Sequence, residues 1–271
     1  MRKNKGIYIG SRTSPKGGSR ACLCWDTNTY SRDCCDGSIQ AQGIGNITGI
    51  APEPVNPPLT DATFSQAITD ILAQDPNGDY DLAPYGKIQD WNVSQVTNMG
   101  NAFSGKTAFN GDISSWDVGN VTNMSSMFKN AWQFNQNISG WNVSSLLYMT
   151  RMFEKAYNFN QDLNTWDVSN VTLMIQLFNN AQSFNGIIND WDTSSATLMG
   201  SMFSGANAFN QTLSNWDVSN VTDMVSMFNG AVTFNQDLSG WDVSNVTFCN
   251  NFSSNTPQWL LPKPNFTNCT P

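Results

Sequence analysis

A tryptophan recurs every 25 residues through most of this chain, and this period constrains the fold more than any other feature of the sequence. The seven members of the column are Trp91, Trp116, Trp141, Trp166, Trp191, Trp216 and Trp241. Columns of Phe, Met and a Phe–Asn pair keep the same period, without an insertion. Such self-similarity indicates a stack of repeats, in which each unit buries its apolar face only against its neighbours.

One unit, residues 213–231, illustrates the predicted local structure. Trp216 and Val218 alternate with Asp217, as in a half-buried strand. The apolar residues that follow are spaced three or four apart, which predicts a short helix: Val221, Met224, Met227, Phe228 and Ala231. The Asn after each repeated Phe is predicted to form an internal ladder, whose amides satisfy backbone groups where successive coils bend. The pattern therefore predicts an α/β solenoid of 25-residue strand-turn-helix coils.

The flanking segments differ in composition from the repeats, and we divide the chain accordingly. Residues 1–50 are basic, contain cysteines and are predicted to anchor or oligomerise the protein, and residues 51–60 form a Pro-rich linker. Residues 61–85 are the predicted N-terminal cap, with an amphipathic helix over residues 61–75. The solenoid then covers residues 86–247, and residues 248–271 form the C-terminal cap.

The charge distribution separates a basic end from an acidic body. Residues 1–32 hold seven Lys and Arg against one acid, although the whole chain has a net charge of -8. The basic end is either an interaction arm or a solvated terminus. An acidic body argues against nucleic-acid binding, because phosphates require Lys and Arg. We expect neither membrane insertion nor a secretory signal, since no apolar run approaches the roughly 18 residues that span a bilayer.

The residue content also argues against catalysis. The chain contains no His, which removes Ser-His-Asp and Cys-His arrangements and the commonest general base. A carboxylate pair remains conceivable, but its members would stand in repeated columns with like environments, whereas an acid and a base need unlike ones. We therefore expect no enzymatic activity and no cofactor.

The residue after each repeated Trp is the best candidate for ligand binding, because it is predicted to face solvent across the sheet. This column consists of Asn92, Asp117, Asn142, Asp167, Asp192, Asp217 and Asp242. Neighbouring strands lie roughly 4.8 Å apart, so the Asp side chains would crowd one another and could attract calcium or bind sugar hydroxyls. The alternative is a solvated ladder in which Asn dilutes the charge.

The six cysteines fall into two groups. Cys22, Cys24, Cys34 and Cys35 are candidates for two disulfides or for a four-thiolate zinc site, although their spacing is not that of paired C-x2-C knuckles. Cys249 and Cys269 lie in the C-terminal cap and could be joined by a disulfide. Simple burial is the alternative for Cys249, which occupies a Met position of the repeat.

The repeat WDVSNVTxMxxMFxxAxxFNxxL resembles the BspA-like variant of leucine-rich repeats, found in surface proteins of bacteria, protists and viruses. The resemblance covers residues 60–271 and implies a right-handed solenoid that adheres to proteins or glycans. Residues 1–50 lie outside it. Their string ACLCWDTNTYSRDCCDGSIQAQGIGNIT resembles N-terminal segments of marine phage virion proteins.

Together these resemblances imply a virion surface protein, which attaches to other virion proteins through residues 1–50. Its solenoid would then contact a protein or glycan of the host surface. Two alternatives are a cell-surface adhesin and a purely structural decoration protein without a ligand. The oligomeric state stays open, with a homo-oligomer among the alternatives.

Overall fold

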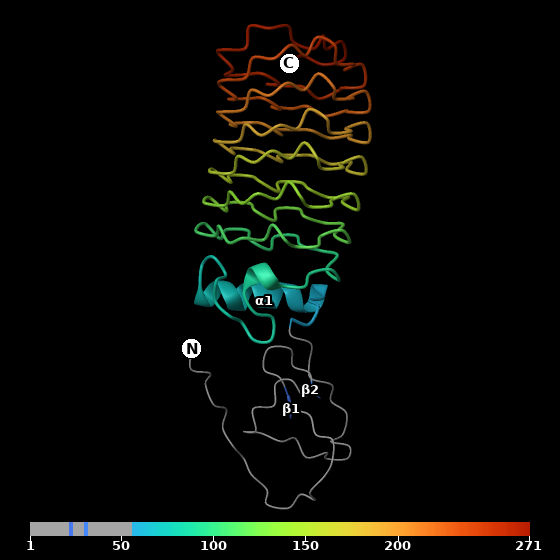
Figure 1. Ribbon diagram of the computed structural model, residues 1–271. Coiled ribbons are helices and arrows are strands. Elements are labelled where there is room, and N and C mark those ends of the chain that lie inside the picture. Colours follow the sequence, from blue (N-terminus) through green and yellow to red (C-terminus); the bar gives the residue numbers. More distant parts are fainter. Residues whose placement is uncertain (1–21, 24–29, 32–55) are drawn as a thin grey trace, which may run out of the picture. The chain divides into compact units, whose positions relative to one another are not determined.

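The computed structural model describes residues 22–23, 30–31 and 56–271, and the chain forms two compact units, Met1–Glu53 and Pro54–Pro271. In the first unit, β1 (Cys22–Leu23) pairs antiparallel with β2 (Tyr30–Ser31). The second unit contains α1 (Asp61–Gln74), the 3-10 helix η1 (Ile88–Asp90) and a stack of coils that continues to the C-terminus (Figure 1). Among the described residues, no helix is long and apolar enough to cross a membrane.

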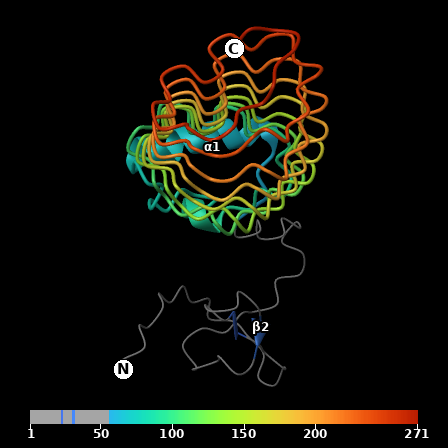
Figure 2. The same ribbon diagram turned by 90° about the horizontal axis from the view of Figure 1, so that it is seen from above.

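The coils of residues 91–259, which we call the coil stack, repeat with the 25-residue period of the sequence. One residue of each coil forms a parallel bridge with the residue 25 positions along the chain, and this bridge column consists of Asn98, Asn123, Tyr148, Leu173, Leu198, Asp223 and Phe248. Backbone N–H groups donate to the next coil at alternate positions, as from Met224 to Phe248 O at 2.8 Å and from Ser226 to Asn250 O at 2.9 Å. Successive coils therefore lie over one another around a common interior (Figure 2).

The helix predicted in each coil is not formed: within residues 91–259 the chain runs through successive turns instead. In the coil that begins at Trp216, Ser226 and Gly230 have left-handed backbones, with φ of 55° and 76°. Ser226 is the third residue of a turn closed by a 3.1 Å hydrogen bond from Met227 N to Met224 O, as in type II turns. A left-handed residue costs about 1–2 kcal/mol and ends a right-handed helix. The hydrogen bonds between coils offset this cost.

The predicted strand position is also wrong. Trp216 and Val218 are buried and Asp217 is exposed, so the expected alternation of side chains is present. The parallel bridge of this coil, however, forms at Asp223, seven residues after the tryptophan. Alternation reports which side chains point inward, but it does not identify the backbone that pairs with the neighbouring coil.

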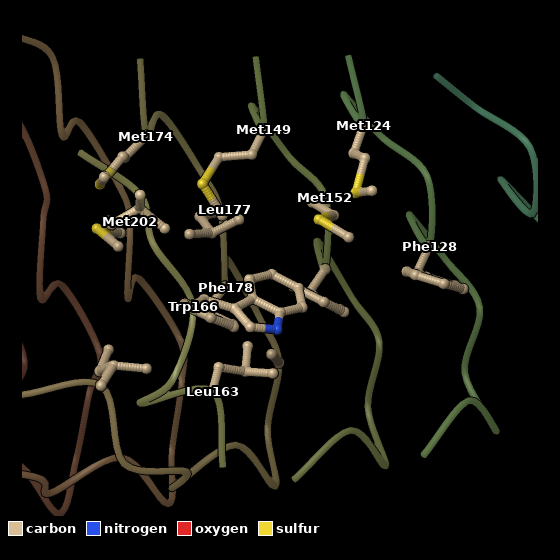
Figure 3. Close-up of a cluster of buried hydrophobic side chains, with 14 of the residues drawn as sticks. Met124, Phe128, Met149, Met152, Leu163, Trp166, Met174, Leu177, Phe178 and Met202 are labelled. Carbon is tan, nitrogen blue, oxygen red and sulfur yellow. The ribbon is translucent and has the colours of Figure 1, made fainter. Parts of the chain in front are cut away.

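The interior consists of columns of like side chains, each stacked on its counterpart in the next coil (Figure 3). The indoles of Trp141 and Trp166 are almost parallel, at an interplanar angle of 5° and a centroid distance of 6.4 Å. Phe128 stacks on Phe153 of the next coil at 5.6 Å and on Phe134 of its own coil at 3.8 Å. Fully burying one Phe side chain contributes about 1.5–3 kcal/mol, so these columns are the main source of stability.

The Asn ladder predicted from the sequence is present, but it lies at the surface of the stack and not in its interior, since Asn135, Asn160 and Asn210 are exposed. The side-chain oxygen of Asn135 accepts a hydrogen bond of 2.9 Å from the backbone N–H of Asn160. The Asn160 oxygen accepts one of 2.8 Å from Asn185 N, and Asn185 accepts one of 2.9 Å from Asn210 N. Each amide therefore satisfies a backbone donor of the following coil, which connects the coils outside the core.

At the N-terminal end, α1 covers the first coil. The Thr63 hydroxyl accepts a 3.0 Å hydrogen bond from the backbone N–H of Thr60, which precedes the helix. Phe64 is buried and meets the Trp116 ring edge-on at 5.7 Å. The Asp61 carboxylate accepts a 2.7 Å hydrogen bond from the backbone N–H of Thr97. The helix thus replaces a preceding coil for both the apolar core and the backbone donors.

At the C-terminal end, the chain crosses the last coil. Leu238 N donates to Pro262 O at 3.0 Å, and Phe266 meets Phe252 at a centroid distance of 4.9 Å. Cys249 and Cys269 form a disulfide with a Cα–Cα distance of 5.9 Å. Cys249 is fully buried in the place that Met holds in earlier coils. Burial and disulfide formation, which the sequence left as alternatives for Cys249, therefore occur together.

Candidate functional site

The Asp and Asn column after the tryptophans lies on the outside of the coil stack, as expected. All seven side chains are exposed: Asn92, Asp117, Asn142, Asp167, Asp192, Asp217 and Asp242. Their oxygens, however, bond to their own chain two residues further on. Asp192 Oδ1 accepts hydrogen bonds from the Ser194 N–H at 3.0 Å and from its hydroxyl at 2.6 Å. The column therefore closes a local turn in each coil, a role that the sequence analysis did not predict.

These bonds also lower the pKa of Asp192 and of Asp242. The hydroxyl and the backbone N–H of Ser194 hold the pKa of Asp192 below its usual range, and they outweigh smaller opposing effects of burial and of the Asp167 charge. Hydrogen bonds from Ser244 lower the pKa of Asp242 in the same way. The charged forms of Asp192 and Asp242 are thus stabilised by hydrogen bonds within their own coils.

The arrangement of this column does not support the calcium hypothesis. Among the described residues, no group of three or more His, Cys, Asp and Glu side chains lies close enough together to hold a metal ion. Calcium takes six to eight oxygen ligands, whereas one oxygen of Asp192 is already occupied by Ser194.

Most of the N-terminal cysteine candidates lie outside the residues that the structure describes. Cys24, Cys34 and Cys35 are outside the described residues, and Cys22 is described only as part of the backbone of β1. The choice between disulfides and zinc in this segment stays a prediction.

A pair of surface aromatic residues gives the clearest candidate for a ligand contact. The rings of Trp132 and Tyr157, on neighbouring coils, have centroids 5.7 Å apart and an interplanar angle of 34°. Trp132 is 44% exposed, whereas the repeated tryptophans are buried. The two rings form a continuous aromatic surface that faces solvent.

The fold does not require aromatic residues at this position. The equivalent residue is Thr107 in the preceding coil and Gln182, Asn207 and Val232 in the following ones. The backbone bond is the same with aromatic and with polar side chains, since Asn158 N donates to Trp132 O and Ala208 N donates to Gln182 O, each at 3.1 Å. The column thus tolerates polar side chains, so Trp132 and Tyr157 are not explained by packing.

Two carboxamides stand beside the rings. Gln133 and Asn158 directly follow Trp132 and Tyr157, and both are exposed. The Asn158 Nδ2 donates a 2.8 Å hydrogen bond to Gln133 Oε1, which fixes the two side chains against each other. An amide carries two donors and an acceptor, so this single bond leaves each side chain with hydrogen-bonding capacity for a ligand. We call these four residues the aromatic platform.

A buried carboxylate lies in the same two coils. Glu154 is 8% exposed, and its Oε2 lies 3.0 Å from Lys129 Nζ and 3.8 Å from Arg151 Nε. This oxygen accepts no hydrogen bond from the described residues. Glu154 therefore pairs ionically with Lys129 of the preceding coil and with Arg151 of its own coil.

A second candidate surface runs along the bridge column. Asn98, Asn123 and Asp223 use their side-chain oxygens to accept the backbone N–H two residues on, at 2.8–2.9 Å. Tyr148, Leu173 and Leu198 interrupt these positions with side chains that have no such acceptor. Tyr148 is 47% exposed. Three neighbouring coils thus carry one exposed and two partly exposed side chains without such an acceptor, where the fold accommodates a polar turn residue.

Neither surface was predicted from the sequence, because both consist of residues that interrupt the repeated columns. Trp132 is the one tryptophan within residues 86–247 that departs from the 25-residue period, and this departure was visible in the sequence. In a repeat protein the constant columns form the core. The residues that break a column without disturbing the backbone are therefore the better signal of a specific function.

Comparison with known proteins shows that one family profile matches this chain. The profile described as "Mycoplasma protein of unknown function, DUF285" matches residues 80–186 and residues 161–260. Together the matches run from residue 80 to residue 260, which is more than half of the 271-residue chain. This result is consistent with the resemblance of the repeat to BspA-like proteins. No curated protein and no solved structure matches the chain.

Proposed function

Since the chain belongs to the DUF285 family, whose function is unknown, we propose from its own geometry that it is a non-enzymatic binding protein. Its ligand is a carbohydrate, and its contact surface is the aromatic platform. The observation that carries this proposal is the pair of Trp132 and Tyr157, an exposed and a partly exposed ring 5.7 Å apart at a position where the fold accepts Thr, Gln or Asn.

The chemistry of the platform suits a sugar chain. One face of a pyranose ring is a row of C–H groups, which packs against an aromatic ring, and its edge carries hydroxyls. Two rings on neighbouring coils offer contact to two successive sugar units, and aromatic side chains supply large contact areas at low conformational cost. The amides of Gln133 and Asn158 lie at the edge of these rings and can exchange hydrogen bonds with hydroxyls.

A non-catalytic role is supported by the chemistry that the chain lacks and by the form of its surface. It has no His, and the carboxylates of the repeated Asp column bond to the residue two positions on in their own coils, as Asp192 does to Ser194. The hollow between α1 and the first coil is lined by Leu72, Pro76, Lys106, Thr107, Ala108 and Phe109. None of these six side chains is a carboxylate that could act as a general acid or base.

Binding of the full chain to an array of bacterial and algal polysaccharides tests the proposal, followed by titration calorimetry of the positive hits. Trp132→Ala removes the larger ring, and we expect it to weaken binding by about tenfold or more, equivalent to roughly 1.4 kcal/mol. Tyr157→Ala should act in the same direction.

Val232→Ala is the matched control, because Val232 is an exposed residue of the same column, three coils beyond Tyr157 in the order of the sequence. It should leave both affinity and melting temperature unchanged. If no polysaccharide binds, or if Trp132→Ala binds as tightly as the unaltered chain, the carbohydrate assignment is wrong.

A second candidate function is contact with a protein, and the apolar interruption of the bridge column favours it. Tyr148 and its neighbours Leu173 and Leu198 occupy adjacent bridged positions, and contiguous exposed apolar groups are typical of protein interfaces. Cross-linking with host-surface extracts, in which Leu173→Asn abolishes capture of one defined protein and Trp132→Ala does not, would favour this function over the first.

We also propose that the coils form a leucine-rich-repeat-like solenoid displayed at a surface, with the virion surface as its place. The parallel bridges at a 25-residue period support the first part. The second part is supported by the resemblance of residues 1–50 to virion proteins, and these residues would attach the chain to the particle. Immunogold labelling of purified particles and of cells, with antibody to the full chain, separates a virion protein from a cellular adhesin.

A further inference from the structure

The cations of the body are concentrated around the aromatic platform. Residues 56–271 contain six Lys and Arg, and three of them are Lys129, Arg151 and Lys155. Between Asp117 and Asp162 the chain contains one acid, Glu154. A segment of two coils therefore carries an excess of positive charge, although the chain as a whole has a net charge of -8.

The cations lie on the same two coils as the platform. Lys129 precedes Trp132 by three residues, and Lys155 precedes Tyr157 by two. The two coils are joined directly beside them, since Asn130 N donates to Glu154 O at 2.8 Å. All three cations are at least partly exposed to solvent.

Local contacts orient two of the cations and leave them able to bind a ligand. The Arg151 Nε donates a 2.6 Å hydrogen bond to Gln176 Oε1, so the far edge of the guanidinium keeps its paired N–H donors. Such a pair matches the two oxygens of a carboxylate or the oxygens of a sulfate. Glu154 holds Lys129 from beneath, but one carboxylate does not balance three cations.

We propose that the ligand is an anionic polysaccharide. Its sugar rings stack on Trp132 and Tyr157, and its carboxylate or sulfate groups pair with Arg151 and Lys155. This inference rests on the proposed function and deepens it. Single-stranded nucleic acid also combines rings with negative charge, but proteins that bind it line a long groove with cations. The remaining described surface of this chain is acidic, with Asp residues in most coils.

Matched polymers test the inference with the full chain. Alginate is compared with carboxyl-reduced alginate and heparin with desulfated heparin, and oligo-dT serves as the nucleic-acid probe. In at least one pair, we expect the anionic polymer to bind about tenfold tighter than its neutral or less charged counterpart. Salt at 0.5 M should remove most of this difference in affinity. The pair that shows the difference identifies carboxylate or sulfate as the recognised group.

Charge-removing variants locate the contact. Arg151→Gln and Lys155→Gln should each weaken binding of the anionic polymer by about three- to tenfold and leave binding of the neutral counterpart unchanged. Lys263→Gln is the control, because it removes the same charge beside Trp259, at the C-terminal end of the coil stack. It should change neither affinity.

The outcomes separate the two proposals. Equal affinity for charged and neutral polymers, with Trp132→Ala weakening both, would overturn the anionic ligand and leave the carbohydrate function intact. Binding of oligo-dT more tightly than any polysaccharide would overturn the anionic-glycan inference. Absence of binding to every polymer would overturn the proposed function itself.

Discussion

The indole N–H of Trp166 donates a 3.1 Å hydrogen bond to the backbone carbonyl of Ile138, 28 residues earlier in the chain. Ile138 is the equivalent, one coil earlier, of Leu163, which lies three residues before Trp166. The bond therefore joins two neighbouring coils. Trp141 and Trp191 make the same bond, to Ile113 and Leu163, at 3.1 and 2.8 Å. From Trp116 onward, each repeated tryptophan therefore contributes both a stacked ring and a polar connection 28 residues back along the chain, whereas Trp91 donates to Gly86 O.

The first prediction separates these two contributions at Trp166. Trp166→Ala should lower the free energy of unfolding by about 3–5 kcal/mol, because it leaves a cavity in the core. Trp166→Phe keeps an aromatic ring but leaves the Ile138 carbonyl without its donor, and it should cost about 1–2 kcal/mol. Urea denaturation followed by circular dichroism measures both. A loss below about 1 kcal/mol for Trp166→Ala would contradict the packing role of the ring.

The second prediction concerns the Asn ladder. Asn160→Ala removes the acceptor of the Asn185 N–H and should destabilise the chain by about 1 kcal/mol. Asn160→Asp is the matched control, since a carboxylate keeps an oxygen in the same place and should retain most of the stability. If the two variants melt alike, the ladder contributes nothing through this acceptor.

The sequence predicted the core columns because burial in a repeat protein depends on the period. Trp216, Val218, Val221 and Met224 are all buried, as their spacing requires. It did not predict the backbone of the coil, because turns like that from Met224 to Met227 also direct inward side chains that are three or four residues apart. Only the left-handed φ of residues such as Ser226 distinguishes this path from a helix, and Ser gives no local signal for it.

The candidate site could be predicted only in part. Asp192 is exposed, as expected for the residue next to a buried Trp. Its bond to Ser194, however, depends on a turn, whereas the alternation of buried and exposed side chains predicted a strand there. The contact of Trp132 with Tyr157 required the coil register, which sets residues 25 apart side by side. Their chemistry was visible in the sequence, whereas their exposure was not.

The third prediction is a loss of stability in acid. The pKa of Asp192 is lowered by its hydrogen bonds to Ser194 in the folded chain, so the unfolded chain binds protons more readily. Its contribution to stability is therefore full above the unfolded pKa of about 3.9 and is lost as the pH falls through the lower folded value. Ser194→Ala should move the pKa of Asp192 upward, as measured by NMR of its carboxyl carbon. An unchanged pKa would contradict the role of the serine.

The fourth prediction is that chelation leaves the coils unchanged. One oxygen of each repeated Asp or Asn is occupied by the residue two positions on, as in Asp167 with Ser169 at 2.6 Å. Calcium would have to displace these bonds to collect its ligands. The melting temperature of the full chain should therefore be the same in EDTA and in millimolar calcium. A rise in calcium that Asp192→Asn abolishes would instead reveal an ion at this column.

The last prediction concerns the disulfide between Cys249 and Cys269, which closes a segment with a sequence separation of 20 residues. Closing a loop of this length stabilises a folded chain by about 3 kcal/mol, chiefly by restricting the unfolded state. Cys269→Ser is the cleaner variant, because Cys249 is fully buried in a Met position and a hydroxyl there would add a cost of its own.

Cys269→Ser should therefore lower the urea midpoint and expose the backbone amides of residues 248–261 to hydrogen exchange before those of the central coils. Thr270→Ser, at the exposed neighbouring position, is the control and should change neither quantity. The end of a repeat stack has only one neighbouring coil to support it, so the effect should diminish toward Trp166. Uniform faster exchange through all coils would mean that the stack unfolds as one unit and that the cap stabilises it globally.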